Sequence, residues 1–197
     1  ESDPDARHDF LHGFLRLPRQ SDGRWDLAAA TYHPLLVMAE HGEQRSWLRL
    51  QRLLSRYDGW PILHYGETET LSLRRLAQRQ GASDAQLRRL KRRLVDVHAR
   101  IRSHWRLPLS SYGLKSVAAW RGFRWSQAGV DGARALLWWR QWLGEGPKRR
   151  GSRHGLAWIF RYNQDDCRAT WAVAEWLLKE DDLLKTGPDT DQLTAGP

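Results

Sequence analysis

The sequence predicts one α/β domain in which helices pack against a layered sheet. Strand-like segments stand early in the chain and helix-like segments stand late. A short apolar run at 61–66, bounded by turn-forming residues, is typical of a buried strand. Acidic residues follow this run directly, at the strand end where open α/β sheets bind their ligands. We expect the domain to span residues 1–181 and residues 182–197 to form a disordered tail.

The first third of the chain predicts a hairpin followed by a helix. Residues 9–17 and 24–32 have strand composition, and the Pro, Asp and Gly at 18–23 favour a turn between them. Residues 41–57 place Trp and Leu at three- and four-residue spacing, which predicts an amphipathic helix.

Two helices are expected after the strand at 61–66. The first spans 69–80, and its Leu residues recur at helical spacing. The second begins at Ser83-Asp84, a typical helix start, and continues to about residue 102 as one helix. Apolar side chains recur at three- and four-residue intervals throughout it: Leu87, Leu90, Leu94, Val97 and Ile101.

Three further helices are expected in the second half of the chain. The first is short, at 115–120, and the next spans 130–143. The last runs from 154 to about 179 and contains Tyr162-Asn163-Gln164-Asp165-Asp166.

Composition limits the class of protein. The net charge of +9 and the isoelectric point near 10.3 favour a polyanionic partner such as nucleic acid. The single cysteine excludes an intrachain disulfide framework and agrees with a reducing cytoplasm, so we expect a cytoplasmic protein. The sequence contains no signal-peptide pattern and no apolar stretch of membrane-spanning length.

Much of the positive charge lies on the helix expected at 84–102. Its basic residues form either a solvated outer face or a surface that follows phosphates, and the second interpretation predicts binding that weakens steeply with salt. A second basic cluster, Lys148-Arg149-Arg150 with Arg153, lies in a Gly-rich segment that we expect to be a mobile loop near the cleft.

Twelve tryptophans are unusual for this length. Exposed aromatic rings would suit base stacking on a single strand. Several of them fall within helical patterns, where an aromatic residue usually belongs to the core, and we assign none to substrate. The tryptophans within helical patterns are Trp138, Trp139, Trp142, Trp158, Trp171 and Trp176.

Acidic residues at two places are candidate metal ligands. Tyr162 and Asp166 are four residues apart on a helix and share one face, which would place a carboxylate beside a phenol able to orient water. The same spacing is also common without a function. Glu67 and Glu69 either bind a ligand or complement the helix dipole. The histidines show no paired zinc spacing, and we expect His64 to be a hydrogen-bonded core residue.

Several segments, taken in order, resemble one protein family. They are Glu1-Ser2-Asp3-Pro4 with Phe10-Leu11-His12-Gly13, His64-Tyr65-Gly66-Glu67-Thr68-Glu69, Ser111-Tyr112-Gly113-Leu114-Lys115 with Arg121-Gly122-Phe123, and Tyr162-Asn163-Gln164-Asp165-Asp166-Cys167. Their succession is similar to the YprB-type ribonuclease H-like domain, a branch of the DnaQ-like 3′–5′ exonucleases with four acidic residues and a tyrosine (DEDDy). The resemblance covers the chain to about Leu178. It implies a ribonuclease H-like mixed sheet flanked by helices, with the first strand mostly truncated.

The resemblance assigns catalytic roles residue by residue. Glu1 matches the Glu of the family's first motif, Asp-x-Glu, whose Asp would stand two residues before it. Glu69 matches the acidic residue of the second motif, where most relatives have Asp. Tyr162 and Asp166 match the third motif, Tyr-x-x-x-Asp. The resemblance implies that Glu1 and Asp166 bind two Mg²⁺ or Mn²⁺ ions directly, that Glu69 acts through a water, and that Tyr162 helps to place the nucleophile.

The expected partner is DNA or RNA. Lys115 and Tyr112 belong to the family's segment before the third motif, and Arg92 and Arg149 belong to the two basic clusters. We expect these four to contact nucleic acid. The family domain often follows a RecB-like nuclease domain in bacterial proteins, so such a domain is expected in the same full-length chain. Because the sequence lacks an initiator Met, we expect it to be a piece of that chain, with weak activity or none by itself.

Three functions remain open from the sequence. The first is a metal-dependent 3′–5′ exonuclease domain. The second is a catalytically silent module that binds nucleic acid for an adjacent nuclease domain. The third is a structural partner-binding domain, which would show no salt-sensitive binding to oligonucleotides.

Overall fold

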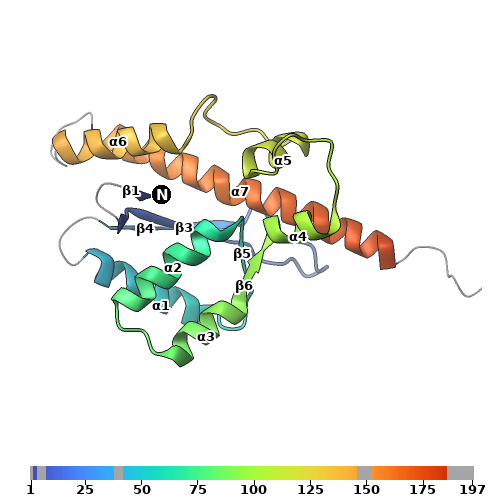
Figure 1. Cartoon of the computed structure of the whole chain (residues 1–197), viewed down its shortest axis with the longest axis horizontal. Helices are drawn as coiled ribbons and strands as arrows, with labels where there is room; N and C mark the ends of the chain where they lie inside the picture. The colour runs from blue at the N-terminus through green and yellow to red at the C-terminus, as the bar shows by residue number, and fades with distance from the viewer. Residues whose placement is uncertain (1, 4–7, 38–41, 146–151, 186–197) are drawn as a thin grey trace, which may run out of the picture.

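Figure 1 shows the computed structural model, which describes residues 2–3, 8–37, 42–145 and 152–185. The fold is mixed α/β, as predicted, and seven helices flank small two-stranded sheets in this part of the chain. Strand β1 (Ser2–Asp3) pairs antiparallel with β2 (His8–Asp9), and β3 (Leu11–Arg16) pairs antiparallel with β4 (Thr31–Leu36). Strand β5 (Ile62–His64) pairs in parallel with β6 (Leu94–Asp96).

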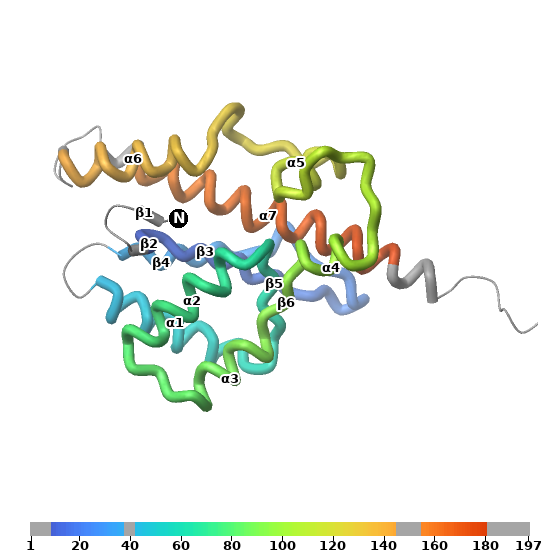
Figure 2. Tube along the Cα trace, in the orientation of Figure 1, coloured from blue at the N-terminus to red at the C-terminus, as the bar shows by residue number. Residues whose placement is uncertain are grey.

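The helices form two groups around the strands (Figures 1 and 2). Helix α7 (Ser152–Lys185) crosses the whole molecule, with α6 (Gly132–Glu145) and α5 (Leu114–Trp120) along it. On the other side of the strands lie α1 (Gly42–Arg56), α2 (Glu67–Arg79) and α3 (Asp84–Arg93). Helix α4 (Val97–His104) contacts α7 and β5. The predicted helices other than the one at 84–102 are confirmed, except that α7 continues to Lys185.

The predicted hairpin is confirmed, but its second strand was placed too early. The expected strand at 24–32 is replaced by an irregular arm, and pairing with β3 begins only at Thr31. The arm is held by its own side chains: Asp22 accepts from the backbone N–H of Arg24 at 2.9 Å, and Asp26 accepts from that of Ala29 at 2.9 Å. Such local hydrogen bonds compete with a strand ladder.

The prediction of one continuous helix at 84–102 is wrong. Helix α3 ends at Arg93, residues 94–96 extend as β6 beside β5, and α4 starts a new helix. Long-range hydrogen bonds fix this break. The Arg93 guanidinium donates to the carbonyls of Leu54, Tyr57 and Trp60 at 2.7 to 3.0 Å. Apolar periodicity alone cannot separate a buried strand from a helical turn over three residues.

Helix α7 lies close against β3 because Gly13 has no side chain. A Cβ atom at Gly13 would stand 1.7 Å from Oδ1 of Asn163. That amide oxygen accepts a hydrogen bond from the Tyr32 hydroxyl at 2.7 Å, so the helix is tied to β4 as well. One turn further, the Cys167 thiol contacts the Gly13 carbonyl at 3.7 Å. The contact between β3 and α7 at Gly13 therefore fixes how far the acidic residues of α7 lie from the strands.

The core explains most of the tryptophans. Trp139 and Trp142 pack with Phe10 and Leu11, and Trp171 and Trp176 belong to a second cluster around α4, α5 and α7. The core interpretation is therefore confirmed for these four rings, and Trp138 is half-buried. It is wrong for Trp158, which is 44% exposed and lies against Trp138 at 5.2 Å between ring centroids.

Candidate active site

The second acidic motif lies where β5 turns into α2. Gly66 makes this turn with a φ of 92°, a conformation that favours glycine. Its N–H donates to Oδ1 of Asp96 at 3.0 Å, and the same oxygen accepts from the N–H of Ala99 at 3.1 Å, at the start of α4. One carboxylate thus ties the turn before Glu67 to the neighbouring helix. Glu69 stands in the first turn of α2, with an exposed side chain.

His64 supports this turn from the core. Its ring is buried, with Nδ1 at 2.8 Å from the Gly66 carbonyl and Nε2 at 3.2 Å from the Thr70 hydroxyl. A carbonyl only accepts, so Nδ1 carries the proton and Nε2 accepts from Thr70. The prediction of a hydrogen-bonded core histidine is confirmed.

The two adjacent aspartates of α7 have different partners. Asp165 accepts from the N–H and the hydroxyl of Ser126, at 2.8 and 2.6 Å. Asp166 accepts from the indole N–H of Trp125 at 2.8 Å. Asp165 therefore anchors the loop that follows α5, and the same loop brings an indole onto one oxygen of Asp166.

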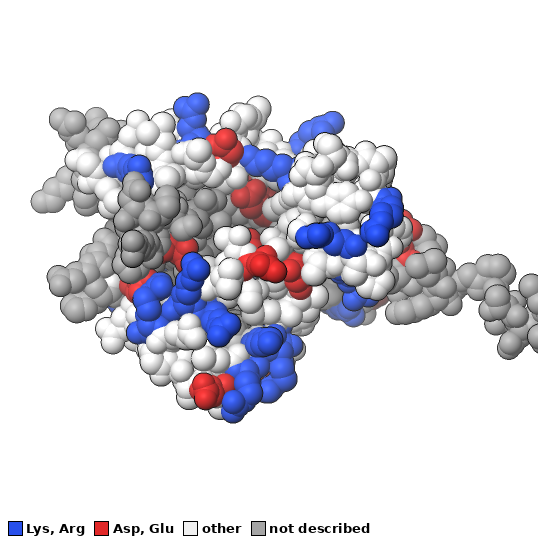
Figure 3. Space-filling view, viewed as in Figure 1, with Lys and Arg blue, Asp and Glu red and all other residues white. Residues whose placement is uncertain are grey.

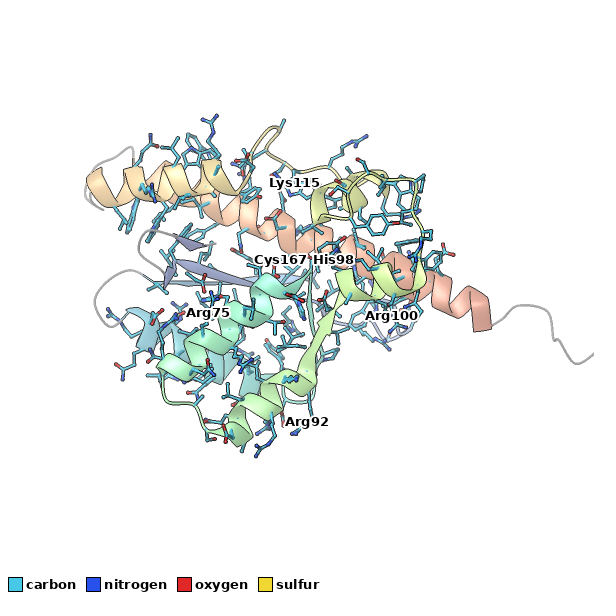
Figure 4. All side chains as sticks on the ribbon, in the orientation of Figure 1. Arg75, Arg92, His98, Arg100, Lys115 and Cys167 are labelled. Atoms are coloured by element: carbon cyan, nitrogen blue, oxygen red, sulfur yellow. The ribbon has the colours of Figure 1, made fainter. Side chains whose placement is uncertain are left out.

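The two acidic motifs lie on elements that pack together. Helix α7, which carries Asp166, contacts β5, the strand that leads into the turn before Glu69. Cys167 follows Asp166 and is half-buried; burial raises the pKa of its thiol to about 12, and the negative charges of Asp166 and Glu69 add to the shift. We call Glu69 and Asp166, with Tyr162 and Cys167 beside them on α7, the carboxylate site. Figure 4 labels Cys167 on α7 near the centre of the view.

The electrostatics of Glu69 and Asp96 differ. Glu69 keeps solvent access, but surrounding protein displaces enough water to raise the pKa of its carboxyl; His64 opposes this shift and Asp96 adds to it. For Asp96, partial burial acts upward, yet hydrogen bonds from the N–H groups of Ala99 and Gly66 hold its pKa below the usual value. Asp96 thus stays ionised as a structural anchor, whereas Glu69 is less stable as an anion until a cation approaches.

Tyr162 lies at the inner side of the site. Its side chain is 5% exposed, and the Lys115 ammonium stands 5.3 Å from the ring centroid. The same ammonium donates to the Val130 carbonyl, so Lys115 joins α5, the following loop and α7. Its predicted phosphate contact stays a prediction.

The other predicted contacts fall in different environments. Tyr112 is half-buried: its hydroxyl accepts from the N–H of Leu107 at 2.7 Å, and its carbonyl accepts from the Tyr65 hydroxyl at 2.7 Å. Arg92 is exposed on α3. Glu1 and Arg149 lie outside the described residues. Trp125 and Asp96 were not singled out from the sequence, because no local pattern reports a hydrogen bond to a distant segment.

The donor set fits a hard cation. The Cys167 thiol is directed to the Gly13 carbonyl at 3.7 Å, and the oxygens of Glu69 and Asp166 are the ligand type that hard cations prefer. In the part of the chain that the structure describes, no group of three His, Cys, Asp or Glu side chains is arranged to hold a metal ion.

The protein-family profile described as the RNase_H superfamily matches residues 1–178. The chain therefore belongs to the ribonuclease H superfamily. The chain matches no curated protein and no solved structure. Membership of this superfamily supports a nuclease that hydrolyses nucleic acid, and nucleases of this superfamily typically use divalent metal ions. Among the described helices, none combines the length and the apolar character needed to cross a bilayer.

Proposed function

We propose that this domain is a metal-dependent 3′–5′ exonuclease of the DnaQ-like branch with four acidic residues and a tyrosine. The packing of helix α7, which carries Tyr162 and Asp166, against β5, the strand that leads into the turn before Glu69, carries the proposal. It brings together acidic residues of two motifs that the resemblance pairs in one site.

The roles follow from the chemistry of each group. Asp166 and Glu1 would hold two Mg²⁺ or Mn²⁺ ions. They would share these ions with an Asp that stands two residues before Glu1 in the full-length protein, and Glu69 would act through a water. Bound ions neutralise charge on the attacking and leaving oxygens of the phosphodiester. Trp125 fixes the orientation of the Asp166 carboxylate by its indole hydrogen bond. Tyr162 would orient the attacking water through its hydroxyl.

The domain boundaries and the protein context belong to the same proposal. We propose that residues 1–181 form the exonuclease domain, that residues 182–197 form its tail, and that a RecB-like nuclease domain precedes it in the full-length bacterial protein. DNA and RNA are both candidate substrates.

The test uses the full-length protein with end-labelled single-stranded DNA and RNA, with and without Mn²⁺. We expect products that shorten only from the 3′ end, and we expect Asp166→Ala to reduce the rate by at least about 1,000-fold. Asp165→Asn is the matched control, because this neighbour holds a loop and should retain most activity. A fully active Asp166→Ala variant would eliminate the assignment.

A second candidate is a catalytically silent nucleic-acid-binding module. It is favoured by Arg75 and Arg92, two exposed arginines that form no ion pair or hydrogen bond with other described residues. This candidate predicts salt-sensitive binding to oligonucleotides without metal-dependent hydrolysis, and a non-carboxylate residue two positions before Glu1.

A further inference from the structure

Exposed basic side chains gather over α2, α3 and α4 on one face of the molecule. Figure 3 shows acidic side chains near the middle of this face and Lys and Arg side chains over α2, α3 and α4 around them. Figure 4 shows Arg75 on α2, Arg92 on α3 and Arg100 on α4 in the same view. We call these three exposed arginines the basic surface.

Arg75 and Arg92 differ from the arginines that hold the fold together. Arg79 donates twice to Glu43, Arg89 pairs with Asp58 at 2.6 Å, and Arg93 binds three backbone carbonyls. By contrast, no ion pair or hydrogen bond joins Arg75 or Arg92 to any other residue within the described ranges. Their charges are therefore not neutralised by the protein and remain available to an anionic partner.

The three helices offer charge and few aromatic side chains, namely His98 and His104 of α4. Residues 67–79, 84–93 and 97–104 contain no Trp, Tyr or Phe. Recognition of bases on a single strand depends largely on stacking against aromatic side chains, whereas phosphates are bound by Arg and Lys regardless of sequence. This surface is therefore suited to the sugar–phosphate backbone and not to the bases.

We propose that the basic surface holds the sugar–phosphate backbone of the strand whose end enters the carboxylate site, without contacting its bases. The inference rests on the proposed function, which supplies the cleaved end. Glu69 and Arg75 stand on the same helix, about 9 Å apart along the axis of α2.

The test measures binding of the full-length protein to labelled single-stranded DNA in EDTA, so that hydrolysis does not interfere. Arg75→Ala and Arg92→Ala should each weaken binding about fivefold at ~0.1 M salt and lower the salt slope by about 0.7. Arg24→Ala is the matched control, because this side chain in the turn between β3 and β4 is 80% exposed and pairs with Asp22. The control should bind like the unaltered protein.

Two further arms separate backbone binding from base recognition and from damage to the carboxylate site. The same losses should occur on a strand of abasic nucleotides, and hydrolysis of a dinucleotide should not respond to Arg75→Ala. Unchanged binding by both variants, an equal loss in Arg24→Ala, or a loss confined to strands that carry bases would overturn the inference.

This outcome is distinguishable from failure of the proposed function. If Arg75→Ala and Arg92→Ala hydrolyse long strands at the rate of the unaltered protein, the proposed role of the basic surface is wrong and the proposed exonuclease activity is not affected. If binding is salt-sensitive and depends on these arginines, but no metal ion supports hydrolysis, the proposed exonuclease activity is wrong and the proposed role of the basic surface is kept.

Discussion

Helices α7 and α3 are both rich in polar residues, but they use them in opposite ways. On α7, Asn163, Asp165 and Asp166 each bind a side chain or backbone group of another segment. On α3, Arg93 is bound by carbonyls of the segment after α1, whereas Arg92 points into solvent without a protein partner in the described residues. Substitutions on α7 should therefore change stability and activity together. On α3, substitutions of Arg92 and Arg93 should change nucleic-acid binding and stability separately.

The largest effect on stability is expected at the contact between β3 and α7. Gly13→Ala forces a methyl group onto Asn163, and we expect it to lower the free energy of unfolding by about 3 kcal/mol. Chemical denaturation of the full-length protein measures this value. Gly144→Ala is the matched control on α6, where a Cβ meets no atom within 4 Å, and it should be neutral or slightly stabilising. Equal unfolding midpoints for the two variants would contradict the tight contact.

The next effect compares two neighbouring arginines on α3. Arg93→Ala removes three hydrogen bonds from a charged donor to carbonyls, and we expect a loss of about 2 kcal/mol in the free energy of unfolding. Arg92→Ala should change it by less than about 0.5 kcal/mol, while it weakens oligonucleotide binding. If both variants unfold at the same denaturant concentration, the division of α3 into a structural and a binding arginine fails.

The smallest expected effect is a pH dependence of the free energy of unfolding that comes from His12 in β3. Burial lowers the pKa of His12 to about 4, below its ordinary value of 6.5. The folded state therefore keeps His12 neutral while the unfolded chain takes up a proton, so this residue's contribution is full above pH 6.5 and is lost as the pH falls toward 4.

Replacement of His12 tests this sign. Between pH 7 and pH 5 the unaltered protein should lose about 1–2 kcal/mol more stability than His12→Gln. A His12→Gln profile parallel to that of the unaltered protein would contradict the assignment.

The sequence predicted what local patterns encode. Amphipathic spacing located the helices, and the resemblance predicted the ribonuclease H-like fold that the family assignment supports. The break at 94–96 could not be predicted, because Arg93 and Asp96 are fixed by partners more than 25 residues away.

The same limit applies to the site. The spacing of Tyr162 and Asp166 was visible in the sequence, but the indole on Asp166 and the ammonium over Tyr162 come from the segments around α5. Gly13 also gave no local signal, since its role depends on Asn163 across the β3–α7 contact.

The proposed function requires that Asp166 binds divalent cations, whereas Asp165 holds the loop at Ser126. Calorimetric titration of Mn²⁺ into the full-length protein tests it most directly, with Asp165→Asn and Asp166→Asn as a matched pair that removes one charge each. We expect saturable Mn²⁺ binding to persist in Asp165→Asn and to be lost in Asp166→Asn. Undiminished Mn²⁺ affinity in Asp166→Asn would contradict the account.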